Sequence, residues 1–175
     1  MKKMVWITGT IMGLLLCIPW LVTVNLLYSD PQFKSNDLIG YTVLLVIFSL
    51  IFVGVRNHRE KNLGGNISFG KAFKTGVYIT LVAGTVYVLA WICFFYLVVP
   101  DFMEVYTEHV LYQCTTESER EAKATEMAHF SSLYEKPLFV VLITYAEVLP
   151  LGFVVSLVSA LSLKKKGPDD FRPAA

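Results

Sequence analysis

Four apolar stretches, each long enough to cross the hydrocarbon core of a bilayer, divide this chain of 175 residues. They run from Met4 to Tyr28, from Leu38 to Val55, from Thr75 to Val99 and from Leu138 to Leu163. Within a bilayer every backbone polar group needs a partner from the chain itself, so such segments fold as helices. The sequence therefore predicts an all-α polytopic membrane protein, with four transmembrane helices in a single domain over residues 1–166.

The first stretch also has features of a signal peptide, because Lys2 and Lys3 precede its apolar run. The apolar core of a cleavable signal is typically about 7 to 15 residues long, whereas this run is about 25 residues long. We therefore interpret Met4 to Tyr28 as the first transmembrane helix.

The charged residues are sorted by segment, although the formal net charge is only +1. Lysines and arginines gather before the first stretch, between the second and third, and after the fourth, whereas residues 100–136 hold eight acidic residues against three basic ones. Short segments rich in Lys and Arg stay on the cytoplasmic side of a membrane. We therefore expect both termini in the cytoplasm and the loop 100–136 outside.

The loop between the second and third stretches is basic and begins the third helix early. Phe69 and Phe73 share one helical face, which predicts an amphipathic first turn at the level of the lipid headgroups. Basic side chains at this level attract anionic headgroups by about 1 kcal/mol each, although they can also serve only to set the topology. His58 in this loop is expected to be exposed. The candidate headgroup contacts are Arg56, Arg59, Lys61, Lys71 and Lys74.

Residues 100–136 are predicted to form an external helical hairpin. Apolar residues recur at helical spacing after Asp101. Thr116 and Glu119 fit a capping box at the start of a second helix, and Pro137 suits the first turn of the fourth transmembrane helix. We expect the apolar stripe of the hairpin to pack on itself or on the mouth of the bundle. Residues 167–175 lack periodicity and are expected to form a disordered tail.

Small residues at four-residue spacing mark three of the four stretches. In lipid, helices pack closely where small side chains let their backbones approach. We expect these stripes to give a tight cytoplasmic half of the bundle, with bulky aromatic residues making the outer half wider; alternatively, small residues are simply frequent in membrane helices. The stripes are Gly9, Gly13 and Cys17; Gly76, Thr80 and Gly84; and Gly152, Ser156 and Ala160.

Glu147 is the one acidic residue within the four stretches. At a rise of 1.5 Å per residue it lies about 15 Å deep, near the middle of the membrane. It stands close to Pro150, which removes a backbone hydrogen bond and favours a kink. An ionisable residue at this depth is a functional-site hypothesis. Tyr87 lies at a matching depth, so the candidate intramembrane polar site comprises Glu147, Tyr87 and Pro150.

Three interpretations of Glu147 stay open. It makes a structural hydrogen bond or a contact between protomers, it handles protons or ions, or it is a tolerated neutral acid. On a helical wheel it points about 140° away from Gly152 and about 180° away from Ser156. Two alternatives follow. Either a kink at Pro150 changes the register of the helix, or Glu147 faces a different neighbour from the helix on which the stripe packs.

The sequence lacks the motifs of enzymes. It has no nucleophile elbow, Walker motif, zinc-protease motif, Cys-x-x-Cys or dinucleotide fingerprint. Glu126 and His129 form a single Glu-x-x-His pair, whereas carboxylate-bridged metal sites need two such pairs. No basic surface is large enough for nucleic acid. We therefore expect no catalytic residue, metal, cofactor or nucleic-acid partner.

Three segments are distinctive in their order and spacing: RNHREKNLGGNISFGKAFKTG after the second stretch, PDFMEVYTEHVL after the third, and AEVLPLGFVVSLVSALSLKKK at the end. Together they resemble DUF4199, a family of small bacterial four-span membrane proteins of unknown function. The resemblance implies an all-helical fold in a bacterial inner membrane, and it transfers no catalytic or binding residue.

These observations favour a non-enzymatic accessory or interaction component of the inner (plasma) membrane. Its expected partners are anionic lipid headgroups at the inner face and either further copies of the chain or another membrane protein. The alternative is a small oligomeric transporter or channel that uses Glu147 as a proton or cation site.

Overall fold

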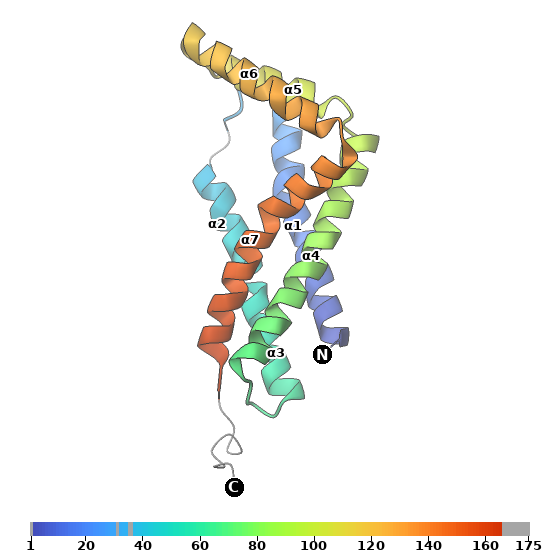
Figure 1. Cartoon of the computed structure of the whole chain (residues 1–175), viewed down its shortest axis with the longest axis vertical. Coiled ribbons are helices and arrows are strands. Elements are labelled where there is room, and N and C mark those ends of the chain that lie inside the picture. Colours follow the sequence, from blue (N-terminus) through green and yellow to red (C-terminus); the bar gives the residue numbers. More distant parts are fainter. Residues whose placement is uncertain (1, 31, 35–36, 166–175) are drawn as a thin grey trace.

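The structure, a computed structural model, describes residues 2–30, 32–34 and 37–165, and helices form most of this part of the chain (Figure 1). Three long helices and one helix pair run along the molecule, and two shorter helices lie across one end of it. The helices are α1 (Lys2–Ser29), α2 (Asp37–Phe48), α3 (Leu50–Asn62), α4 (Phe69–Leu97), α5 (Phe102–Tyr112), α6 (Glu117–Tyr134) and α7 (Pro137–Leu163).

Four helical segments of the described chain are long and apolar enough to span a membrane, which confirms the predicted fold class. Their outward faces carry large apolar side chains; Leu97, for example, is 80% exposed. In a soluble protein such faces would be costly, whereas lipid tails cover them without penalty. The spans are Lys2–Ser29, Leu38–Asn62, Phe69–Leu97 and Pro137–Leu163.

The second span comprises α2 and α3, which meet at a local irregularity at Ser49, where the backbone angles stay helical. Ser49 separates α2 from α3, and its hydroxyl donates to the carbonyl of Val46 at 2.6 Å. The Phe52 N–H donates to the Ser49 carbonyl at 3.0 Å, which is the tighter turn of a 3₁₀-helix. Beyond this point α3 continues to Asn62, past the predicted end of the span at Val55.

The extension of α3 corrects the expectation that His58 is exposed. His58 lies on the helix rather than in a loop and is only 5% exposed, because α3 packs against both α4 and α7. Its ring nitrogen Nδ1 lies 3.4 Å from the side-chain oxygen of Asn62, one turn further along.

α4 is the central helix, and it packs along α7 on one side and α1 on the other. A Cβ atom placed on Gly9 or on Gly13 would lie 2.6 Å from the Cβ of Val82 or Val86 respectively, so α1 and α4 approach as closely as glycine allows. The same holds between α7 and α4, where Gly152 faces Thr80 without room for a methyl group. All nine residues of the predicted stripes are buried.

Polar contacts reinforce the packing of α4 on α7. The hydroxyls of Thr80 and Ser156 lie 3.3 Å apart, and each also bonds to a carbonyl within its own helix. A Cβ atom on Gly76 would lie 2.8 Å from the side chain of Ser156. Gly84 is less constrained, since its nearest neighbour beyond the backbone would lie 3.4 Å away.

α5 and α6, which we call the cap, lie across one end of the bundle (Figure 1). Tyr28 at the end of α1 donates to Asp101 at 2.8 Å, and Gln113 donates to the carbonyl of Phe33 at 3.2 Å. Met127 is the buried residue of α6. These contacts hold the cap on the bundle.

The capping box at the start of α6 is formed. The Glu119 N–H donates to the Thr116 hydroxyl at 3.2 Å, as expected. The Glu119 carboxylate accepts from the N–H of Thr115 at 3.0 Å and from its hydroxyl at 3.2 Å. These bonds, led by the one from the Thr115 backbone, lower the pKa of Glu119.

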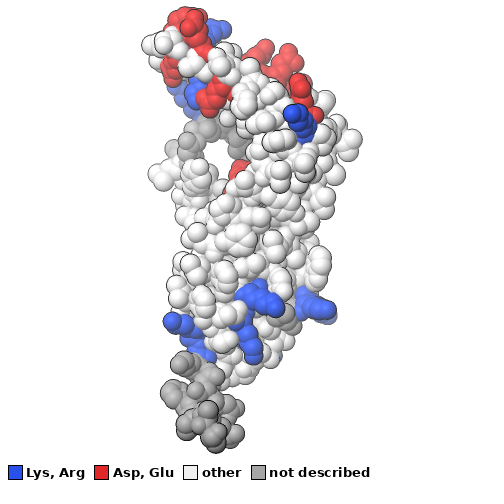
Figure 2. Space-filling model, viewed as in Figure 1, with Lys and Arg blue, Asp and Glu red and all other residues white. Residues whose placement is uncertain are grey.

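The charged side chains separate along the molecule (Figure 2). Acidic residues gather on the cap, and basic residues gather at the opposite end, where α1 begins and α7 ends. At that end a short antiparallel bridge joins Ile67 to Lys165, with hydrogen bonds of 3.1 and 2.9 Å. The predicted tail, residues 167–175, lies outside the described residues.

Candidate functional site

A cavity of about 260 Å³ lies between the cap and three of the spans, α1, α4 and α7. α1, α4, α5, α6 and α7 all contribute to its lining, and Figure 2 shows the surface hollowed beneath the cap. Most of the lining is apolar or aromatic. The aromatic side chains that face it include Trp20, Tyr87, Trp91, Phe102, Tyr106 and Phe130.

Glu147 lies in the wall of this cavity and, among the described residues, is the only Asp, Glu, Lys or Arg that lines it. The Tyr87 hydroxyl donates to its carboxylate at 3.4 Å. The structure therefore brings together two of the three residues predicted as an intramembrane polar site. Pro150 does not line the cavity and lies within an uninterrupted α7.

Glu147 faces the same helix as the small-residue stripe, which differs from its placement on a straight helical wheel and agrees with the alternative in which a kink at Pro150 changes the register. Gly152 packs on Thr80 of α4, and Glu147 reaches Tyr87 of the same helix. Two features explain the difference: α7 changes direction near its middle (Figure 1), and the long glutamate side chain extends back towards α4. A wheel drawn for a straight helix misses both.

Two residues of the cavity lining have buried ring nitrogens, Trp20 and His109. The Trp20 indole lies within hydrogen-bonding reach of the Cys17 side chain. The ring nitrogen Nδ1 of His109 has no hydrogen-bond partner among the described residues, which costs about 1–3 kcal/mol. Sequence reasoning missed Trp20, although it lies about as far from the cap end of α1 as Glu147 lies from that of α7.

Aromatic rings form a continuous wall from the bundle to the cap. The ring centroids of Trp20 and Trp91 lie 5.1 Å apart and those of Trp91 and Phe102 lie 5.2 Å apart, both edge to face. Phe102 in turn stacks on Tyr106 at 5.7 Å. Such contacts hold the rings in fixed orientations, so the wall is a rigid surface.

Tyr134 of α6 stands beside this wall. Its ring lies 5.5 Å from that of Phe95. Burial, followed by the nearby charges of Glu147 and Tyr106, raises the pKa of Tyr134 to about 12. Tyr134 is therefore a neutral hydrogen-bond donor at physiological pH.

The bundle is closed between the cavity and the end that holds the termini. Phe48, Thr80 and Ser156 are each at most 1% exposed and fill the space between α2, α4 and α7. The close approach of Gly152 to Thr80 leaves no room for an open passage between α4 and α7 at this level. The cavity is therefore a pocket on the cap side rather than a passage through the described bundle.

An apolar groove of about 680 Å³ lies beside the cavity, between α1 and α2. Thr23 and Phe33 line both the groove and the cavity, so the two spaces share a wall. Lys34 lines the groove at its cap end. The remaining lining is mostly apolar and includes Leu15, Ile18, Val22, Leu26, Val43 and Ile47.

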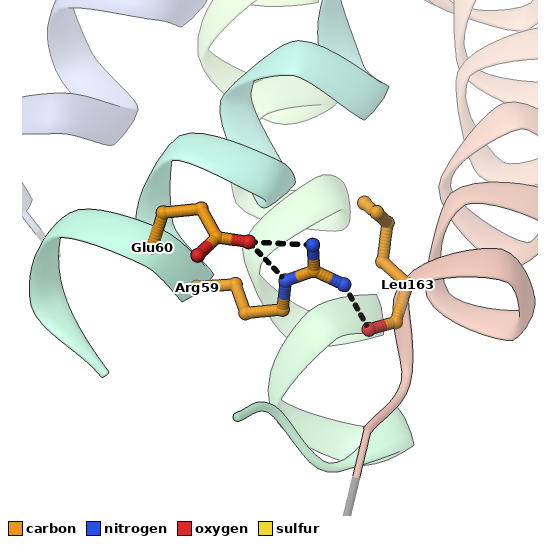
Figure 3. Close-up of polar contacts among 3 residues, drawn as sticks. All are labelled: Arg59, Glu60 and Leu163. Carbon is orange, nitrogen blue, oxygen red and sulfur yellow. Dashed lines mark hydrogen bonds and ion pairs between the residues drawn. The ribbon is translucent and has the colours of Figure 1, made fainter. Parts of the chain in front are cut away.

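The five basic residues predicted to contact lipid headgroups lie at the end opposite the cap, and Arg59 differs from the others. Its side chain is 18% exposed; Nη1 donates to the Leu163 carbonyl at 3.1 Å, and Nε donates to Glu60 at 2.9 Å (Figure 3). Arg59 thus caps the carboxyl end of α7 from within the chain. The other four, Arg56, Lys61, Lys71 and Lys74, are exposed.

Among the described residues, no three His, Cys, Asp or Glu side chains lie close enough to hold a metal ion. Glu126 and His129, which have the spacing of a ligand pair, are exposed on α6. Glu126 pairs with Lys123 at 2.7 Å.

A family model described as "Protein of unknown function (DUF4199)" matches residues 7–165 of the chain. No curated protein and no solved structure matches it.

Proposed function

Since the chain belongs to the DUF4199 family of proteins of unknown function, we propose its function from the geometry of its cavity. The protein is a non-enzymatic accessory component of the membrane that binds a small ligand between its cap and helices α1, α4 and α7. One observation carries this proposal. Glu147, whose carboxylate accepts from the Tyr87 hydroxyl, lines one cavity together with the aromatic side chains of Trp20 and Trp91. A pocket with an apolar wall and a few convergent polar groups is typical of ligand sites.

The proposed location is a bacterial inner membrane, with the termini in the cytoplasm and the cap outside. The separation of charge supports it, because basic residues gather at the end opposite the acidic cap (Figure 2). Lys61 and Glu121 are exposed at opposite ends and allow a test. In a chain without other cysteines, a membrane-impermeant maleimide is expected to label Glu121→Cys but not Lys61→Cys in intact cells. The reverse pattern would invert the proposed topology.

The closed lower bundle supports binding over conduction. A small oligomeric transporter or channel with Glu147 as a proton or cation site is the second candidate, because Glu147 faces the cavity. Conduction would require the Gly152–Thr80 contact to open. Purified protein in proteoliposomes is expected to give no proton flux. A flux that Glu147→Gln abolishes would favour the transporter.

The tryptophans allow a direct test of binding. Trp20 and Trp91 line the cavity, whereas the third, Trp6, is 63% exposed at the far end of α1. Replacing Trp6 with Phe leaves two reporters in the cavity wall. In dodecyl maltoside micelles, we expect at least one of dodecyltrimethylammonium, dodecyl phosphate and dodecanol to change their fluorescence saturably. If none of the three does, the proposed function is wrong.

A further inference from the structure

We propose that the ligand is an amphipathic organic cation, with its ammonium group in the cavity and its alkyl chain in the groove between α1 and α2. This inference rests on the proposed function and assigns the chemical class of the ligand.

The charge of the cavity selects a cation. Of the described residues, Glu147 is the only Asp, Glu, Lys or Arg that lines it, so an anionic group would meet one negative charge and no positive one. Aromatic rings attract ammonium groups. The side chains of Trp20 and Trp91 line the same cavity as Glu147.

The groove accounts for the rest of the ligand. Because Thr23 and Phe33 line both spaces, a molecule that occupies the cavity extends into the groove past these two side chains. Within the described ranges, Lys34 is the only Asp, Glu, Lys or Arg lining the groove, and it lies at the cap end, so the deeper part suits only an apolar chain. The groove belongs to two predicted membrane spans, α1 and α2, so the ligand enters from the bilayer rather than from water.

Three probes that share a twelve-carbon chain separate the contributions of charge and chain. Dodecyltrimethylammonium is expected to bind to the Trp6→Phe protein at least tenfold more tightly than dodecanol or dodecyl phosphate. Tetramethylammonium, which lacks the chain, is expected to bind at least tenfold more weakly than dodecyltrimethylammonium. Glu147→Gln should weaken the binding of dodecyltrimethylammonium at least tenfold. Glu121→Gln, on the exposed face of the cap, should leave the affinity for dodecyltrimethylammonium unchanged.

A variant that fills the groove tests the position of the chain. Gly40 lines the groove, and a methyl group added there would meet no atom within 4 Å, so Gly40→Phe adds bulk at the groove with little strain. Gly40→Phe should weaken the binding of dodecyltrimethylammonium but not that of tetramethylammonium. If both cations lose affinity equally, or neither does, the chain does not occupy the groove.

The outcomes separate this inference from the proposed function. In one outcome, dodecanol or dodecyl phosphate binds saturably and as tightly as the cation, with an affinity that Glu147→Gln leaves unchanged. That result would overturn the cation assignment and leave a ligand-binding cavity in place. The absence of binding by every probe would overturn both.

Discussion

The Tyr87 hydroxyl donates to the Glu147 carboxylate at 3.4 Å and thereby joins α4 to α7 at the cavity wall. A second pair joins the same two helices, because the hydroxyls of Thr85 and Tyr145 lie 2.9 Å apart. The second pair is solvent-exposed in the structure and does not line the cavity. The two pairs therefore provide a matched comparison of a cavity contact with a contact on the outer surface.

We expect Tyr87→Phe to weaken ligand binding several-fold, because it removes the hydroxyl that orients the Glu147 carboxylate. Tyr145→Phe removes a hydroxyl from the same helix pair and is expected to leave binding unchanged. Titration of tryptophan fluorescence in the Trp6→Phe background measures both. Equal losses in the two variants would mean that α4–α7 packing, rather than the carboxylate, determines affinity.

Gly152→Val is expected to destabilise the protein by about 1–3 kcal/mol, because the added side chain overpacks the contact with Thr80 and Phe48. Gly70→Ala is the control, since a methyl group there meets nothing within 4 Å. Unfolding in mixed micelles with increasing dodecyl sulfate measures the difference. Wild-type stability for Gly152→Val would contradict the close approach of α4 and α7.

Removing the Arg59 guanidinium is expected to loosen the end of α7. Arg59→Gln loses the bond to the Leu163 carbonyl, which we expect to cost about 1 kcal/mol (Figure 3). Arg56→Gln removes an exposed arginine from the same helix. Hydrogen exchange over the last turn of α7 should accelerate in the first variant only. If Arg59→Gln lowers the affinity of the protein for anionic vesicles more than Arg56→Gln does, Arg59 contacts lipid instead.

Thr116→Ala should fray the start of α6 and cost about 1 kcal/mol of stability, because the Glu119 N–H loses its partner. Amide exchange in the first turn of α6 measures the fraying.

The effect of pH on the cap has a definite sign. The pKa of Glu119 is lowered in the folded cap, so its carboxylate stabilises the cap above the unfolded pKa, and this contribution is lost as the pH falls through the folded pKa. Amide exchange in the first turn of α6 should therefore quicken in acid. Exchange that is slower in acid than at neutral pH, after correction for intrinsic rates, would contradict this assignment.

The spans are predictable because length and hydropathy alone determine them. The close contacts at Gly9, Gly13 and Gly152 also lie in the predicted stripes, since small residues are what permits such approach. The local irregularity at Ser49 is not predictable, because a serine in an apolar run is compatible with a regular helix. The burial of His58 depends on how far α3 continues beyond the bilayer, and no local signal marks that end.

The pairing of Tyr87 with Glu147 follows from matching depths in the membrane, whereas the cavity around them does not. It depends on the cap, which brings Tyr106, His109 and Phe130 over side chains that lie far away in sequence. The direction of Glu147 differs from that on a straight helical wheel, because α7 changes direction near its middle. Tertiary placement of this kind is not encoded in the periodicity of any one segment.

Protection of a single cysteine tests the ligand-binding cavity most directly. Thr23 lines both the cavity and the groove, whereas Thr42 is exposed on α2 and lines neither. In a chain with Cys17, Cys93 and Cys114 replaced, saturating dodecyltrimethylammonium is expected to slow thiol labelling at Thr23→Cys at least tenfold and to leave Thr42→Cys unaffected. Adding Glu147→Gln should abolish the protection. Labelling of Thr23→Cys at the same rate with and without the cation would contradict the account.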